Sequence, residues 1–166
     1  KLNIATTAAA EHYTASIAHL VLTEPGLFTN MHPTMRRFIV WHSAEEIEHK
    51  TVAFDIMQAV GVGYFQRILA YFIVSFDILL WNTIATLMLL RQDRLSFWKI
   101  FSFNLKFRKQ SKHMNKKFRR LLSAYLRKNF HPNQLDELPQ APAELNALGI
   151  TNNNLNPSFN ETGTHL

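Results

Sequence analysis

The sequence contains 166 residues with a net charge of +6 and no cysteine. Its length allows one domain at most, and the absence of cysteine excludes both disulfide bonds and thiolate metal ligands. Any metal ion must therefore be bound by carboxylates and by some of the eight histidines. The chain opens at Lys1 without an initiator Met or a signal-peptide pattern, so we interpret it as the C-terminal portion of a longer protein.

Helical patterns follow one another along most of the chain. Residues 4–22 are rich in alanine and lack glycine and proline, residues 34–60 form a long helical pattern that ends at a Gly-Val-Gly sequence, and residues 64–91 are strongly apolar. Residues 95–128 are basic and helical, with an apolar stripe at helical spacing made of Met114, Phe118, Leu121, Leu122 and Tyr125. Because no strand alternation, internal repeat or Gly-rich phosphate loop occurs, the predicted class is all-α.

The strongest chemical signal lies in the sequence WHSAEEIEHK, residues 41–50. Four of its titratable groups share one stripe, roughly 100° wide, on a helix: His42, Glu45, Glu46 and His49. The stripe continues through the apolar residues Met35, Phe38, Ala53, Ile56 and Val60, so we expect it to face the core. Buried carboxylates must neutralise, pair or bind metal, and a Glu-x-x-His pair such as Glu46 and His49 lets one helix offer an oxygen and a nitrogen to one ion.

A carboxylate on the first predicted helix matches this pair. Glu11 lies on a small apolar face, formed by Ala8, Ala15, Ala18 and Leu22, and has no cationic partner along its own helix. We expect Glu11 to act as a bridging ligand that faces the Glu46 and His49 helix across a short antiparallel connection. His42 fits either a third imidazole ligand or a group that orients Glu46, and Glu45 is a possible additional ligand or supporting group.

Each of these features also has an ordinary structural explanation. Glu-x-x-His occurs by chance in many helices, the glutamates of residues 45–48 fit a solvated helix face, and Glu11 suits a helix N-terminus. His12 and His19 are expected at the surface or in contact with the metal ligands. The conjunction of Glu11, a turn and the Glu-x-x-His helix is what favours a metal site.

Both motifs resemble a bacterial family of predicted metal-dependent hydrolases. The resemblance rests on the sequence ATTAAAEHYTA at residues 5–15 and on WHSAEEIEHKTVAFD at residues 41–55, with a looser match at Phe-His-Pro, residues 130–132. It covers residues 4–63 well and extends loosely to about residue 136. It implies a ferritin-like helical bundle in which Glu11, Glu46 and His49 are half of a dimetal ligand set, the other Glu and Glu-x-x-His helices lying upstream.

On this basis we divide the chain into four parts: half of a metal-binding bundle at 1–63, an apolar and possibly membrane-embedded helix at 64–93, a basic amphipathic segment at 94–130 and an irregular tail at 131–166. The leading functional hypothesis is a dimetal oxidoreductase, with two iron ions, acting on a hydrophobic substrate. The alternatives are a hydrolase that uses a metal-activated water, with manganese or zinc as other metals, and a non-catalytic subunit of a membrane complex. The missing ligands are expected from an upstream half of the same protein or from another chain, and an oligomer is possible.

The apolar segment and the basic segment predict association with a membrane, which for this family would be the bacterial inner membrane. Residues 68–90 are long enough to span a bilayer, although Asp77 would be costly against lipid, and Ser75, Asn82 and Thr86 suggest a face packed against protein. Twelve Lys and Arg and no Asp or Glu lie in residues 94–128. Both a transmembrane helix and an interfacial one seated on an anionic membrane fit this pattern, whereas no nucleic-acid-binding module is recognised.

Overall fold

The computed structural model describes residues 1–24, 31–94, 98–102, 105 and 111–135. Within these ranges the chain forms helices and no strand, which confirms the all-α prediction. The elements are α1 (Leu2–Thr23), α2 (Pro33–His49), α3 (Val52–Ala59), α4 (Tyr64–Gln92), α6 (Lys112–Ala124) and the 3-10 helix η2 (Pro132–Leu135). The tail predicted beyond residue 135 lies outside the described residues.

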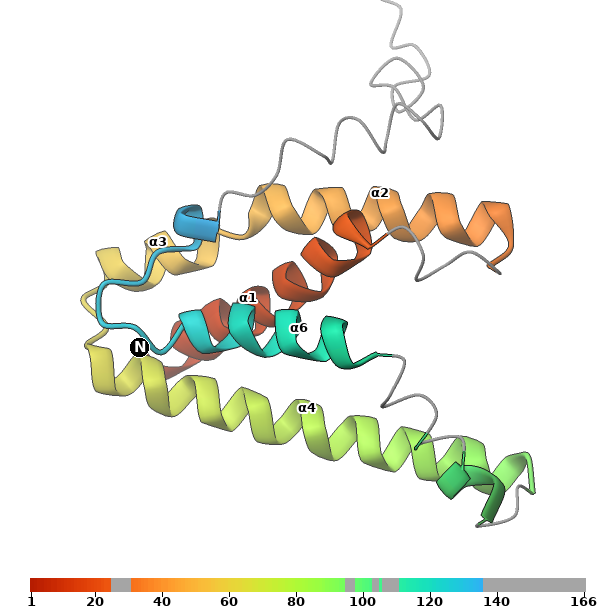
Figure 1. Ribbon diagram of the computed structural model, residues 1–166. Coiled ribbons are helices and arrows are strands. Elements are labelled where there is room, and N and C mark those ends of the chain that lie inside the picture. Colours follow the sequence, from red (N-terminus) through yellow and green to blue (C-terminus); the bar gives the residue numbers. More distant parts are fainter. Residues whose placement is uncertain (25–30, 95–97, 103–104, 106–110, 136–166) are drawn as a thin grey trace, which may run out of the picture.

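Helix α1 is the centre of the molecule. It runs obliquely between α2 and α4, with α6 beside it, and it contacts α2, α3, α4 and α6 (Figure 1). Ala5, Ala8 and Ala9 on α1 are at most 2% exposed. Because alanine has high helix propensity and a small side chain, this sequence both forms the helix and lets several neighbours approach it closely.

The single helix predicted over residues 34–60 is wrong, because the structure divides it into α2 and α3. Helix α2 begins with Pro33, which suits the first helical turn, and the Thr34 amide donates to Nδ1 of His32 at 3.3 Å. The break falls at Lys50 and Thr51, where the Lys50 side chain is buried. The turn that follows α3 contains Gly61 at a φ of +68°, a conformation that favours glycine.

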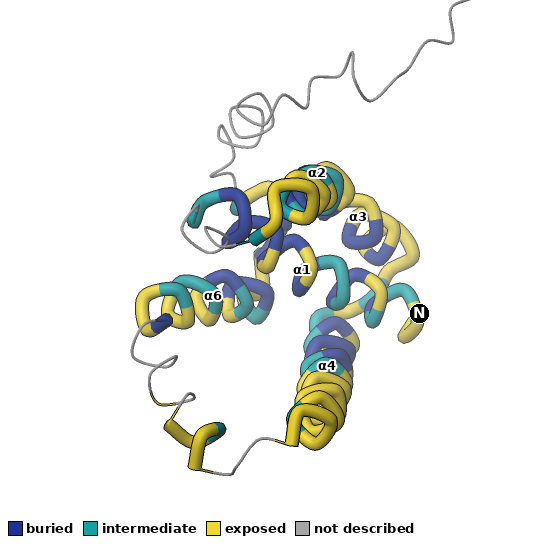
Figure 2. The backbone as a smooth tube through the Cα atoms, turned by 90° about the vertical axis from the view of Figure 1, so that its right-hand side faces the viewer, coloured by how far each residue is buried: buried dark blue, intermediate teal, exposed yellow. Residues whose placement is uncertain are grey.

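Helix α4 is buried only along its first part. Its buried residues are Arg67, Ala70, Tyr71 and Val74. From there to its C-terminal end the helix is largely exposed, as the yellow tube in Figure 2 shows. Of the polar stripe predicted to pack against protein, Ser75 does so by accepting a hydrogen bond from the Tyr13 hydroxyl at 2.6 Å. Asn82 and Thr86 are exposed in this chain, so their packing against protein stays a prediction.

Helix α6 confirms the predicted apolar stripe. Leu121 and Tyr125 are buried, while Met114, Phe118 and Leu122 are half-buried. Immediately after α6, the predicted Phe-His-Pro element folds back over the core. Phe130 is 2% exposed and packs edge-on against Phe54 of α3, and Nε2 of His131 lies 2.9 Å from Oδ1 of Asp55.

A buried arginine joins the start of α4 to the end of α6. The guanidinium carbon of Arg67 lies 5.3 Å from the ring centroids of Tyr64 and Tyr125 and 5.7 Å from that of Phe54. Arg67 also donates a hydrogen bond to the backbone carbonyl of Arg127. Aromatic faces and a carbonyl thus provide the electrostatic partners that a desolvated guanidinium requires.

Candidate metal centre

Glu11 lies on α1, and Glu46 and His49 lie on α2, the helix that packs against α1. Glu11 lies near the middle of α1 and is half-buried, while Glu46 and His49 occupy the last turn of α2. Burial raises the pKa of Glu11, the nearby Glu46 carboxylate raises it further, and His49 lowers it. The charges of Glu46 and His49 on α2 thus act on Glu11 of α1 in opposite directions.

The predicted orientation of the α2 stripe is wrong. The apolar residues that flank the ligands are exposed, at 51% for Met35, 55% for Phe38, 48% for Ile56 and 45% for Val60. The buried residues of α2 are Val40, Ser43 and Ala44, which lie about half a turn around the helix from that stripe. The helix is apolar on two sides, and α1 covers the side opposite to the one predicted.

His42 and Glu45 differ in how they relate to Glu46. Nε2 of His42 lies 3.4 Å from Oε1 of Glu46, one helical turn away, and the His42 ring stacks on Phe38 with a centroid separation of 6.1 Å. This position suits a side chain that orients the Glu46 carboxylate. Glu45 is half-buried on α2 and, within the described part of the chain, makes no ion pair or hydrogen bond.

The chemical types of the predicted ligands suit a metal ion, but the number of ligands is too small. Two carboxylates and one imidazole are hard and borderline ligands that suit iron, manganese or zinc. Among the residues that the structure describes, however, no group of three or more His, Cys, Asp or Glu side chains lies close enough to hold a metal ion. A dimetal centre built on Glu11, Glu46 and His49 thus needs further ligands and a closer approach of these three.

Two histidines that were expected at the surface or beside the ligands are instead buried. His12 and His19 are each 3% exposed. Nε2 of His12 lies 3.1 Å from the Leu121 carbonyl of α6, and its ring packs against Tyr125 and Phe130. Burial lowers the pKa of His12 to about 4, so the ring is neutral at pH 7. His12 faces α6, whereas its neighbour Glu11 faces α2, so the two are separate in role.

The comparison with protein families identifies the chain. A family model described as a predicted metal-dependent hydrolase matches residues 1–136. The chain belongs to this family. No curated protein and no solved structure matches the sequence. The matched range runs from α1 to the residue after η2, so it includes both ligand helices and the Phe-His-Pro element.

Family membership confirms the predicted resemblance and bears on the chemistry. The family description implies use of a divalent metal, and it agrees with the hydrolase alternative better than with the oxidoreductase that was the leading hypothesis. A cleft lined by Lys116, Arg120 and Arg127 was not predicted as a site from the sequence. The only signal for them was the long run of Lys and Arg in residues 94–128.

Proposed function

We propose that this protein is a metal-dependent hydrolase and that the chain contributes Glu11, Glu46 and His49 to its metal centre. The observation that carries the proposal is the match of residues 1–136 to this family, together with the place of Glu11 on α1 and of Glu46 and His49 on the neighbouring helix α2. A carboxylate on one helix and a Glu-x-x-His pair on its neighbour are the kinds of ligand that a ferritin-like metal site uses. The family description supports the hydrolytic reaction.

The remaining ligands are proposed to come from residues that pack on the exposed face of α2 and α3, either an upstream half of the same protein or another chain. That face carries Glu46 and His49 together with Phe38 and Ile56, which are 55% and 48% exposed. Large apolar side chains around half-buried carboxylates suit a surface that is covered in the working protein. A complete centre of this type holds two divalent ions.

The chain's own residues prepare the site for a cation. Because burial and Glu46 raise its pKa, Glu11 holds a proton more readily than an ordinary glutamate and gives up this proton when it acts as a ligand. His42, 3.4 Å from Glu46 Oε1, holds that carboxylate in orientation. When bound, a divalent ion supplies a Lewis acid that lowers the pKa of water and so makes it a nucleophile at neutral pH.

An oxidoreductase with two iron ions is the second candidate. The observation in its favour is the donor set itself, because carboxylates and imidazole without sulfur are the ligands of non-haem iron centres. The two candidates differ in their need for oxygen. Hydrolysis of a long-chain p-nitrophenyl ester under anaerobic conditions, with manganese or zinc in the protein, supports the hydrolase. Consumption of dioxygen by the ferrous protein, without such hydrolysis, supports the oxidoreductase.

The protein is further proposed to work at a membrane, with α4 embedded in it. Helix α4 is 29 residues long. Its most apolar stretch of 18 residues has a mean hydropathy of 1.8, and only 6% of this stretch is buried. The core helix of a soluble protein would be mostly buried. Residues 76–92, beyond the part held by α1, span about 25 Å, whereas the apolar core of a bilayer is roughly 30 Å thick. This comparison favours an embedded or interfacial helix over one that spans the bilayer alone.

The first test of the metal centre is the metal content of the full-length protein purified from its native membrane. We expect about two equivalents of iron, manganese or zinc by mass spectrometry, as for a dimetal carboxylate centre, and loss of both in the Glu46→Ala, His49→Ala variant. Glu48→Ala is the matched control, because Glu48 is exposed on the same turn of α2. A wild-type protein without metal would instead indicate a non-catalytic subunit of a membrane complex, and metal retained by the double variant would exclude these ligands.

A further inference from the structure

A basic cleft lies between α6 and the segment that ends in η2. Its volume is about 720 Å³, and its lining contains His113, Lys116, Lys117, Arg120 and Arg127, together with Leu121, Ala124 and Leu135. None of the lining residues in the described part of the chain is acidic. The cleft thus combines Lys and Arg side chains and the neutral Gln134 with apolar side chains, and it belongs neither to the Glu11 site nor to the aromatic cluster around Arg67.

Most of the positive charge in the cleft has no acidic partner among the residues that the structure describes. Nζ of Lys117 lies 3.2 Å from Oε1 of Glu24 and 2.7 Å from the Thr23 hydroxyl, so its charge is paired with the end of α1. Lys116, Arg120 and Arg127 have no ion pair among the described residues. Three unpaired cations around one concave surface attract an anion, and guanidinium groups suit the oxygens of a phosphate.

The size and lining of the cleft favour a small phosphate ester with an apolar part. A volume of about 720 Å³ is in the range of pockets that hold a single small molecule. A protein that binds a nucleic-acid backbone instead presents an extended stripe of basic side chains along it. The leucines in the lining suit the glycerol and first acyl carbons of a lipid, and α4 on the same molecule exposes a long series of large apolar side chains.

We propose that this cleft binds the phosphate of an anionic glycerophospholipid headgroup, with Lys116, Arg120 and Arg127 as the contacting residues. The proposal rests on the membrane association proposed above and adds a defined site to it. Interfacial α4 provides apolar attachment to any bilayer, while the cleft selects lipids with a negatively charged phosphate group. The lipid is then both an anchor and a means of orienting the protein on the bilayer.

A charge-matched pair of variants tests this site in the full-length protein. The cleft variant is Lys116→Gln, Arg120→Gln, Arg127→Gln. The control is Lys112→Gln, Arg119→Gln, Lys128→Gln, because these three exposed residues belong to the same segment but do not line the cleft. Binding is measured by flotation with vesicles of neutral phosphatidylcholine and with vesicles that also contain phosphatidic acid.

We expect the cleft variant to lose on the order of a hundredfold of its binding to phosphatidic acid vesicles, and the control to lose far less. Equal losses in the two variants would overturn the proposal, because they would show that charge alone matters. Binding to neutral vesicles is expected to be unchanged in both variants. If it is absent in the wild-type protein as well, the membrane association of α4 fails, whatever the cleft does.

Two soluble competitors identify the source of the phosphate. Inorganic phosphate and a 20-base-pair DNA duplex are each added to the wild-type protein bound to phosphatidic acid vesicles. We expect neither to displace it at millimolar and micromolar concentration, respectively. Displacement by inorganic phosphate would replace the lipid with a soluble phosphate ligand, and displacement by DNA that requires the cleft residues would replace it with nucleic acid.

Discussion

The imidazole of His12 on α1 donates its Nε2 hydrogen to the backbone carbonyl of Leu121 on α6, at an N–O distance of 3.1 Å. The two residues are 109 positions apart in the sequence. The contact joins the central helix to the helix that carries the basic cleft, and burial keeps the ring neutral at pH 7 by lowering its pKa to about 4.

The stability of the protein should therefore fall between pH 6.5 and pH 4. Burial lowers the pKa of His12 from 6.5 to about 4, so in this window the unfolded chain binds a proton that the folded chain does not. The contribution is fully present above pH 6.5, is lost as the pH falls, and amounts to about 3 kcal/mol. Urea unfolding at pH 7.5 and pH 4.5 measures the difference. His12→Gln should be less stable at pH 7.5 and should lose less on acidification; equal losses in both proteins would contradict the prediction.

The juxtaposition of the predicted ligands can be measured without any metal. In chelator-treated protein, Glu46→Gln should lower the pKa of Glu11, because it removes a negative charge that raises this pKa. The readout is the ¹³C chemical shift of the Glu11 carboxyl group as a function of pH. Glu48→Gln is the control, since Glu48 does not contribute to the shift of Glu11. If the two variants titrate alike, α1 and α2 do not bring Glu11 and Glu46 together.

Replacing Arg67 by methionine should destabilise the fold by about 2 kcal/mol. The change keeps the length of the side chain but removes three cation–aromatic contacts and the hydrogen bond to the Arg127 carbonyl. Tyr125→Phe is the control within the same cluster. The Tyr125 hydroxyl is buried and has no hydrogen-bond partner among the described residues, so its removal should cost less than about 0.5 kcal/mol. Equal effects on the urea midpoint would show that Arg67 acts only through packing.

A charge on the free part of α4 should weaken binding to neutral membranes. Leu79 is 67% exposed, so Leu79→Arg leaves the fold intact but costs about 2.5–3.5 kcal/mol if the side chain faces the centre of a bilayer. Ile17→Arg is the control, because Ile17 is also half-exposed but lies on α1. Flotation with phosphatidylcholine vesicles measures the difference, and circular dichroism confirms the fold. Unchanged flotation of the Leu79→Arg protein would argue that α4 does not enter the bilayer.

The helices with the clearest composition could be predicted closely. The alanine-rich segment predicted at 4–22 is α1 at Leu2–Thr23, and the apolar segment predicted at 64–91 is α4 at Tyr64–Gln92. The break between α2 and α3 could not be predicted, because buried residues recur at helical spacing on both sides of it, with Val40 and Ala44 before and Phe54 after. A periodic pattern shows which residues share a face, but it does not show that the backbone is continuous.

The candidate site was predictable in its residues and not in its surroundings. Spacing alone placed Glu46 and His49 on one helix face, and the small apolar face around Glu11 indicated a close approach of α1. The same pattern made Phe38 and Ile56 appear to be core residues, although they are exposed in this chain. Apolar character indicates that a face avoids water, but not which polypeptide covers it. The burial of His12 depends on Leu121, a contact for which the local sequence carries no signal.

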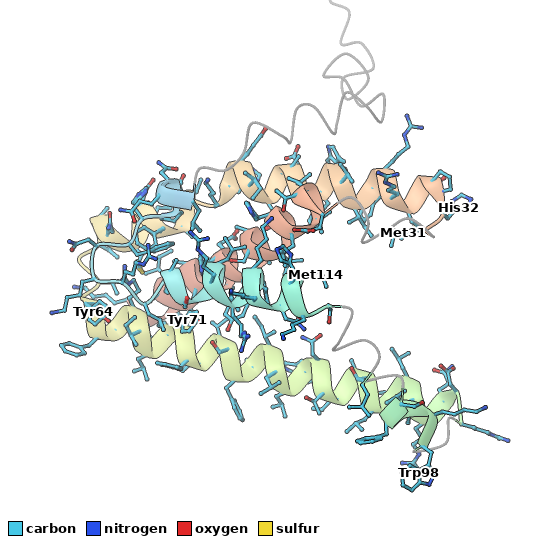
Figure 3. The ribbon with its side chains drawn as sticks, in the orientation of Figure 1. Met31, His32, Tyr64, Tyr71, Trp98 and Met114 are labelled. Atoms are coloured by element: carbon cyan, nitrogen blue, oxygen red, sulfur yellow. The ribbon has the colours of Figure 1, made fainter. Side chains whose placement is uncertain are left out.

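The hydrophobic core combines residues from the first helix with residues near position 130. This separation in the sequence affects how the core forms during synthesis. Ala5 and Ala9 belong to the same cluster as Tyr125 and Phe130, and α1 contacts α2, α3, α4 and α6 (Figure 1). In Figure 3, Tyr71 lies in this region of the molecule, while Trp98 lies at the far end of α4. At about 5–20 residues per second, a ribosome needs roughly 6–25 s to add the residues that complete the cluster. During this interval α2, α3 and α4 can already pack on α1, but the part of the core that Tyr125 and Phe130 complete stays open in the nascent chain.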